Sequence, residues 1–167
     1  MQLRCNIFVI TKMKGVSVID KTDKKILNVL QDNGRRANKD IAGDVGMVPS
    51  AISERIKKLK DKGVIKKFET RLDPVKVEKN LLAFVYVTTN EQVHGWDTGH
   101  KLSEVEEIQE VYNVAGEDCY LIKVRVKDTK GLSDLLREKI GVIDTVVSTR
   151  TTIVLDTYKE TCHIKLD

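Results

Sequence analysis

Apolar residues recur at helical spacing in three successive segments of the first half of the chain, which predicts three short amphipathic helices. Their inward stripes are Ile26, Leu27 and Leu30 in the first, Ile41, Ala42 and Val45 in the second, and Ile52, Ile56 and Leu59 in the third. Capping and breaking residues set the predicted ends at Asp20 and Gly34, at Asn38 and Gly46, and at Pro49 and Gly63.

The pattern changes to that of strands between residues 64 and 72. Val64, Ile65 and Phe68 stand among charged residues, which predicts two short strands before the Asp-Pro pair at 73–74 breaks them. Two short helices joined by a tight turn, followed by such a hairpin, are typical of a winged helix-turn-helix, a fold that places its last helix in the major groove of DNA.

The second half alternates strand and helix patterns in the order βαββαβ. The predicted strands are 81–89, 109–115, 120–126 and a long run within 142–158, and the predicted helices are 101–107 and 132–140. This order predicts a ferredoxin-like antiparallel sheet with both helices on one face, so the whole chain is of the α+β class. The open face of the sheet is most simply covered by a second copy of the chain.

These patterns divide the chain into five parts. They are an N-terminal extension (1–17), a winged helix-turn-helix domain expected to bind DNA (18–73), a linker (74–80), a ferredoxin-like domain (81–160) and a C-terminal tail (161–167). Residues 1–80 hold 19 Lys or Arg and 10 Asp or Glu, a net charge of +9, whereas residues 81–167 hold 10 and 15, a net of −5. A basic first half can release counterions from phosphates, although small domains also differ in charge by accident.

Composition argues against several other classes of protein. The three cysteines, Cys5, Cys119 and Cys162, form no C-x-x-C pair, which fits a reducing cytoplasm and neither a disulfide scaffold nor a structural zinc site. No apolar stretch is long enough to span a bilayer. We find no phosphate-binding, nucleophile-elbow or zinc-protease motif, so we expect neither catalysis nor a cofactor.

The third predicted helix carries the candidate residues for DNA recognition. Residues near the start of such a helix contact base edges, and later ones contact phosphates. We therefore assign base contacts to Ser50, Ser53, Glu54 and Lys57. Backbone contacts are assigned to Arg55, Lys58, Lys60, Lys66, Lys67 and Arg71. For each of these charges the alternative is a solvated helix face.

Four separated segments resemble the Lrp/AsnC family of transcription regulators, also called feast/famine proteins. They are IDKTDKKILNVLQDNGR, DIAGDVGMVPSAISERIKKLKDKGVIKKF, VYNVAGEDCYLIKVRV and VVSTRTTIVL, in the family's order, within residues 18–160. The resemblance implies a winged helix-turn-helix, a ferredoxin-like regulatory domain (the RAM domain), dimers that assemble further, and small effectors that are usually amino acids. Three positions depart from the family's pattern, namely Val48 at the helix cap, Lys67 in the wing and Cys119 in the Gly-x-x-Asp turn.

The candidate effector residues belong to the turn that resembles the family's effector site and to the last strand. Gly116 is expected to permit a tight turn, Glu117 and Asp118 to meet an amino group, and Thr149 and Thr151 to offer hydroxyls beside Cys119. The alternative is a plain β-turn followed by threonines that merely favour strands.

Two alternatives to a sequence-specific regulator remain open at this stage. One is a ferredoxin-like small-molecule-binding module or enzyme whose helix-turn-helix serves only protein contacts. The other is an architectural protein that compacts DNA with little sequence preference.

Overall fold

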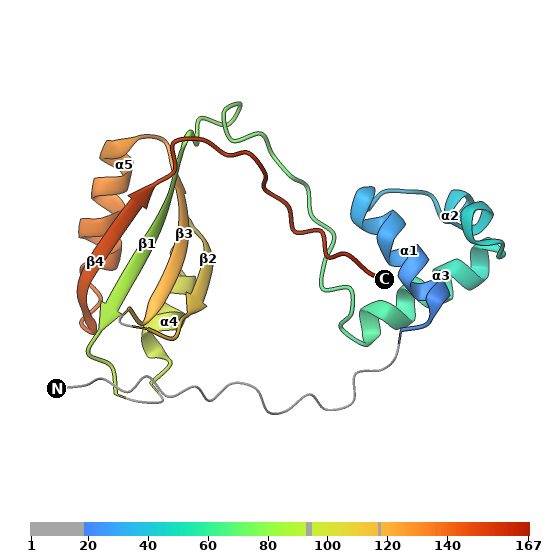
Figure 1. Ribbon diagram of the computed structural model, residues 1–167, viewed down its shortest axis with the longest axis horizontal. Helices are drawn as coiled ribbons and strands as arrows, with labels where there is room; N and C mark the ends of the chain where they lie inside the picture. The colour runs from blue at the N-terminus through green and yellow to red at the C-terminus, as the bar shows by residue number, and fades with distance from the viewer. Residues whose placement is uncertain (1–18, 93–94, 117) are drawn as a thin grey trace. The chain divides into compact units, whose positions relative to one another are not determined.

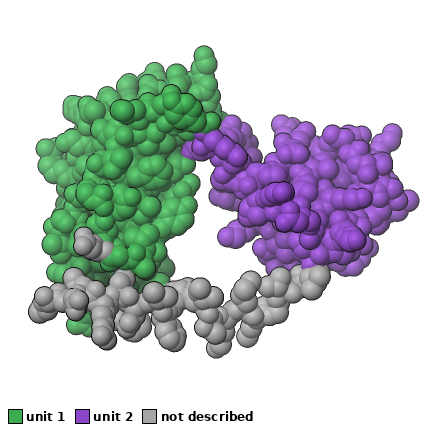
Figure 2. Space-filling view, viewed as in Figure 1, with its two compact units in different colours: residues 1–11, 72–158 green, residues 12–71, 159–167 purple. Residues whose placement is uncertain are grey.

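The computed structural model describes residues 19–92, 95–116 and 118–167 (Figure 1). The predicted extension 1–17 with Cys5 lies outside the described residues, and so does Glu117. The described chain forms two compact units, one of residues 72–158 and one that joins 19–71 to the distant segment 159–167 (Figure 2). None of the described helices is both long and apolar enough to cross a membrane.

The first unit along the chain is a bundle of three helices, α1 (Lys21–Asp32), α2 (Asn38–Val45) and α3 (Pro49–Asp61). The predicted stripes meet in one core, which consists of Ile26, Leu30, Ile41, Ala42 and Ile52 with Val29, Val45, Met47, Ile56 and Ile65 packed around it. Burying these side chains is the main source of the unit's stability, since helices this short are marginal in isolation.

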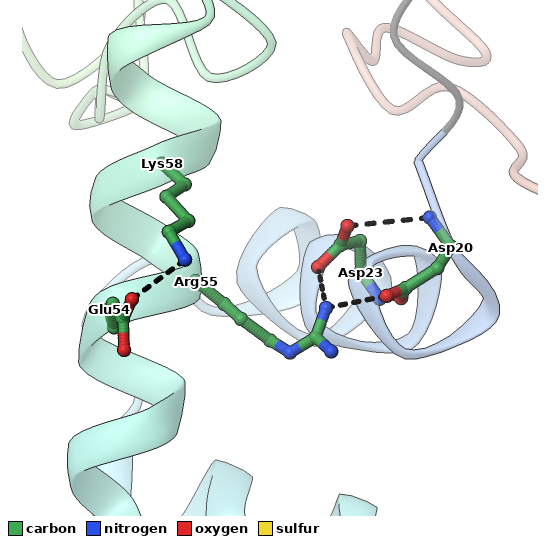
Figure 3. A network of polar contacts seen from close by, with 5 residues as sticks. All are labelled: Asp20, Asp23, Glu54, Arg55 and Lys58. Atoms are coloured by element: carbon green, nitrogen blue, oxygen red, sulfur yellow. Dashed lines mark hydrogen bonds and ion pairs between the residues drawn. The ribbon is translucent and has the colours of Figure 1, made fainter.

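An ionic cluster ties the start of α1 to the middle of α3 (Figure 3). Asp20 caps α1 as predicted: its Oδ1 accepts a hydrogen bond from the Asp23 amide at 2.7 Å, and Asp23 Oδ2 accepts from the Asp20 amide at 3.3 Å. Arg55 Nη1 then donates to both carboxylates, at 2.7 Å each. The capping box and the ion pairs therefore fix α3 against the first turn of α1.

The helix ends confirm two of the predicted glycine stops and correct a third. Gly46 and Gly63 have φ of +70° and +69°, as a left-handed helix end requires. Gly34 is not such a stop, because α1 ends at Asp32 and its C-cap is Asn33, whose backbone is extended. Gly34 is needed for a close approach instead: a Cβ there would lie 3.0 Å from Phe68 Cδ1.

Two further sequence expectations for this unit were wrong. Ala37, not Asn38, is the N-cap of α2. The predicted wing strands at 64–72 do not form in the described chain, where this stretch is a loop that is exposed except at the half-buried Ile65. The amides of Val64 and Ile65 bond to the Leu59 carbonyl at 2.9 and 3.1 Å, so they close α3 instead of joining a ladder.

The other unit is a four-stranded antiparallel sheet in the order β2-β3-β1-β4. The strands are β1 (Leu81–Thr89), β2 (Ile108–Asn113), β3 (Tyr120–Val126) and β4 (Val146–Ile153). The connecting helices are α4 (Asp97–Ser103), α5 (Thr129–Asp134) and the π-helix η1 (Leu135–Ile140), which continues α5. The βαββαβ order confirms the ferredoxin-like prediction.

The strand register decides which residues face the helices. Val85 of β1 pairs with Ile122 of β3, and both are fully buried in a core that also contains Leu102 of α4 and Ile140 of η1. Both helical segments therefore cover the same face of the sheet. The next residue of β1, Tyr86, pairs with Leu121 and lies on the opposite, open face.

The predicted boundaries of β1 and β3 are confirmed, whereas the predicted helix 132–140 begins earlier, at Thr129, and three other segments also move. Strand β4 stops at Ile153 because its partner β1 begins at Leu81, and the last bond joins the Val154 amide to the Leu82 carbonyl. The predicted strand 109–115 is observed as β2, Ile108–Asn113. The predicted helix 101–107 was placed too late, because the Glu91 carboxylate accepts from the Thr98 amide at 3.2 Å at the start of α4.

Replacing Arg55 by Met should weaken the pH dependence of stability. The Asp23 amide and the Arg55 guanidinium hold the pKa of Asp20 below its ordinary 3.8. A lowered folded-state pKa contributes stability above the unfolded value, and this contribution is lost as the pH falls through the folded value. We therefore expect the thermal midpoint of the parent, followed by circular dichroism, to fall more steeply below about pH 5 than that of Arg55→Met.

Arg137→Met is the matched control, because Arg137 is 70% exposed and also pairs with two carboxylates, those of Asp134 and Glu138. Its pH profile should follow the parent's. If the thermal midpoints of the parent and Arg55→Met fell equally steeply with decreasing pH, the assigned role of Arg55 would be contradicted.

Candidate nucleic-acid interface and effector site

The outward face of α3 presents all four candidate base-contacting residues. Ser50, Ser53, Glu54 and Lys57 are exposed and follow helical spacing, so they share one side of the helix. On the opposite side Ile52 is fully buried and Leu59 is 3% exposed. Val48 is the N-cap of α3, and this end of the helix has no capping hydrogen bond from a side chain of the cap residue.

An ion pair already joins two residues of this face (Figure 3). Lys58 Nζ lies 2.7 Å from Glu54 Oε1, and both side chains are nearly two-thirds exposed. The hydrogen bond from Lys58 lowers the pKa of Glu54, which keeps that carboxylate ionised and able only to accept hydrogen bonds. Because exposed pairs of this kind are weak, either residue can exchange its partner for a DNA group at little cost.

The candidate phosphate-binding residues occupy two different environments. Lys66, Lys67 and Arg71 are exposed on the loop that follows α3. Lys67 contacts Glu69, which raises the pKa of Lys67, and Arg71 Nη2 lies 3.2 Å from Glu160 Oε2. Arg55 differs from them, because its side chain is only 32% exposed and turns toward α1, where it positions α3.

One more cation of α3 lies beside an aromatic ring of the loop. Lys60 Nζ is 4.9 Å from the centre of the Phe68 ring, and the edge of that ring approaches Gly34. This cation–π contact joins the end of α3 to the loop. The loop therefore keeps a contact with the helices although it has no strand ladder.

In the regulatory unit, a second polar cluster forms around Asp118 at the end of the β2–β3 turn. Thr88 Oγ1 donates to Asp118 Oδ1 at 3.3 Å, and Arg150 Nη2 donates to Asp118 Oδ2 at 2.7 Å. The Arg150 guanidinium lies 4.0 Å from the centre of the Tyr86 ring. Among the candidate effector residues that the structure describes, Asp118 is thus the one that lies in a charged cluster with groups of β1 and β4.

Strand register separates the two candidate threonines from this cluster. Thr149 and Thr151 pair with Val87 and Val85, so they lie on the helix-covered side of the sheet. Arg150, between them, pairs with Tyr86 on the open side. Sequence reasoning missed Arg150, Tyr86 and Thr88, because alternation within β4 shows two faces but only pairing with β1 tells which of them is open.

The other turn residues shape the hairpin. Gly116 has a φ of +157°, which side chains rarely adopt, in agreement with the turn expected there. The Cys119 carbonyl accepts from the Val114 amide at 3.0 Å and from Asn113 Nδ2 at 3.1 Å, while its own amide donates to Val87 O at 3.0 Å. Cys119 therefore connects β1 to the β2–β3 hairpin and holds Asp118 next to β1.

Comparison with known domains matches both units. Residues 19–66 match the winged helix-turn-helix DNA-binding domain, and residues 82–164 match the Lrp/AsnC ligand binding domain. The first match lies within the three-helix unit, and the second covers the sheet and continues through residue 164.

Similar proteins extend over nearly the whole chain. The HTH-type transcriptional regulator FL11 of Pyrococcus horikoshii is 36% identical over 89% of this chain and 97% of its own. The leucine-responsive regulatory protein of Escherichia coli is 34% identical over 85% and 88%.

Solved structures agree with this assignment. A transcriptional regulator of Neisseria meningitidis in complex with L-methionine superimposes with a TM-score of 0.84 at 28% identity, covering 90% of this chain and 98% of that one. A feast or famine regulatory protein of Mycobacterium tuberculosis complexed with L-methionine gives 0.81 at 31% identity, covering 88% and 99%. The chain therefore belongs to the Lrp/AsnC family of transcriptional regulators.

Proposed function

We propose that this regulator reads duplex DNA with the outward face of α3. The observation that supports this most directly is the exposure of Ser50, Ser53, Glu54 and Lys57 together on that face, opposite the buried stripe. Lysine can donate to guanine O6 and N7, and glutamate can accept from cytosine N4, so the face carries both kinds of readout.

Backbone contacts come from the cations around this face. Lys58, Lys66, Lys67 and Arg71 are exposed and can neutralise phosphates, which would set the register of the protein on the duplex. We assign Arg55 to positioning α3, because both of its carboxylate partners lie within the domain. The net charge of +9 in residues 1–80 supports attraction to DNA.

A second copy of the chain is the proposed cover for the open face of the sheet. That face carries Tyr86 and Leu121 beside the 49% exposed Tyr112, an apolar surface in the middle of a charged chain. A twofold dimer would present two α3 helices, which suits a partly palindromic site, and larger even assemblies follow if dimers associate.

The effector we propose is an α-amino acid bound beside Asp118 and Arg150. The two relatives complexed with L-methionine motivate this choice. A zwitterion offers an ammonium for the carboxylate of Asp118 and a carboxylate for the guanidinium of Arg150, which now satisfy each other at 2.7 Å. Such a ligand would regulate DNA binding only through different affinities for different assemblies.

The proposal includes no catalytic step and places the protein in the cytoplasm. Regulator names among the relatives support the first point. A regulator of transcription needs access to DNA, which supports the second.

Competition and salt titration test the function itself. Binding to fragments selected from the native genome should weaken steeply as salt rises, because each neutralised phosphate contributes about −0.9 to the slope of log K against log salt. Random duplex should compete poorly for these fragments. Equal affinity for selected and random duplexes would favour a protein that compacts DNA. An affinity that does not change with salt concentration would favour a module with no role in DNA recognition.

Comparing Lys57→Ala with Lys58→Ala should distinguish a contact with base edges from a contact with the DNA phosphates. Lys57→Ala is expected to weaken binding to the selected site by about 1–3 kcal/mol and to relax the preference at one base pair. Lys58→Ala should weaken selected and random duplexes alike. Fluorescence polarisation with both duplexes measures the two effects, and an identical pattern of loss in the two variants would refute the division.

Asp118→Asn and Arg150→Ala should impair effector binding. Calorimetric titration with L-methionine, and then with the other amino acids, is expected to show at least a tenfold loss of affinity, about 1.4 kcal/mol, for both variants. Lys127→Ala is the control, because Lys127 is exposed and pairs with Glu78 on the same unit. If both Asp118→Asn and Arg150→Ala kept the parent's affinity for the amino acid, the effector would have to bind at another site.

A further inference from the structure

The nine residues from Lys159 to Asp167 lie against the DNA-binding unit, far in sequence from its other residues (Figure 2). We call them the C-terminal clasp. The side-chain amide of Gln31 on α1 bonds to the clasp twice, donating to the Ile164 carbonyl at 3.0 Å and accepting from the Ile164 amide at 2.7 Å. This paired bond resembles one rung of a sheet and fixes the register of the clasp.

Other contacts extend the docking along the same side of α1. Lys24 Nζ donates to the Asp167 carbonyl, and His163 Nε2 lies 3.7 Å from Asp32 Oδ1. Lys24, Asn28 and Gln31 are spaced to share one stripe of the helix, and Asn28 Oδ1 is buried. The outer side of α1 is thus a surface for an extended peptide.

Docking also places an acidic group of the clasp on a candidate DNA contact. Glu160 Oε2 lies 3.2 Å from Arg71 Nη2, and the Glu160 side chain is only 31% exposed. Arg71 itself is 58% exposed, so it could otherwise reach a phosphate. In the docked state its guanidinium already has an anionic partner from the same chain.

We propose that the clasp is an autoinhibitory element that withholds Arg71 from DNA. Docked on α1, it supplies Glu160 as an internal substitute for a backbone phosphate, and undocked it frees one cation for the duplex. This inference rests on the proposed function, because it concerns the affinity for DNA.

The clasp follows β4 closely in the chain. Residues 154–158 alone separate it from the strand that carries Arg150, and five extended residues span at most about 17 Å. Leu155 and Tyr158 in this connection are 98% and 94% exposed, so little packing holds it in place. The connection between β4 and the clasp is therefore short and exposed.

Glu160→Gln tests the electrostatic part, with Glu138→Gln as its control. Both remove one negative charge, and Glu138 is an exposed residue of the regulatory unit. With a random-sequence duplex followed by fluorescence polarisation, Glu160→Gln should bind about threefold more tightly at low salt, with a slope of log K against log salt steeper by up to about 0.9. The control should keep the parent's slope.

Gln31→Leu tests the docking itself, with Gln109→Leu on an exposed position of β2 as its control. Gln31→Leu should speed hydrogen exchange at the Ile164 amide at least tenfold and steepen the salt slope as Glu160→Gln does. Slow hydrogen exchange at the Ile164 amide in Gln31→Leu, or fast exchange there in the parent, would overturn the proposed docking. Equal salt slopes in Glu160→Gln and Glu138→Gln would overturn the proposed autoinhibition. A parent chain that does not bind DNA would overturn the proposed function, and the clasp's role with it.

Discussion

The burial of Ile52 and Leu59 fixes the rotation of α3 about its own axis, and this rotation decides which residues of α3 the DNA-binding unit exposes to solvent. With two inward residues set by the core, the residues at helical spacing on the far side must face solvent. Arg55 adds a directional restraint, since its guanidinium can reach Asp20 and Asp23 only from one orientation of the helix. Apolar packing and a charge-assisted network therefore specify the same outward face.

In the regulatory unit (residues 72–158), the pairing of the strands decides which side chains lie on the open face, just as the rotation of α3 decides which side chains face solvent in the DNA-binding unit. Cross-strand partners share a face, so the pairing of Tyr86 with Arg150 brings a ring and a cation together on the open side. Asp118 completes the group from a separate turn. A shift of one residue in the β1–β4 register would move Arg150 to the helix-covered side and dissolve the cluster.

Sequence reasoning succeeded where a single local pattern decides the outcome. The stripe of α3, the N-cap at Asp20 and the strand 81–89 were all predictable, because periodicity and capping act within one segment. It failed where distant residues decide. Gly34 lies beside Phe68, and the start of α4 is set by a hydrogen bond to Glu91. Strand β4 ends where β1 offers no further partner. Each of these features depends on contacts between residues that are distant in sequence.

The candidate site shows the same division. The exposed residues of α3 follow from its helical period alone, whereas the neighbours of Asp118 depend on the register between β1 and β4. Thr149 and Thr151 have the right chemistry for a ligand contact, yet alternation puts them on the other side of the strand from Arg150. Residue type and spacing cannot reveal such a separation until the pairing is known.

The DNA-binding unit is discontinuous in sequence, since residues 159–167 complete a body that begins with α1. On the ribosome, α1, α2 and α3 emerge and can pack before any strand of the regulatory sheet exists. The outer side of α1 then remains bare until the whole sheet has been synthesised. During synthesis the chain therefore has Arg71 without Glu160 beside it, and the finished protein carries on this unit an ion pair that its nascent form lacks.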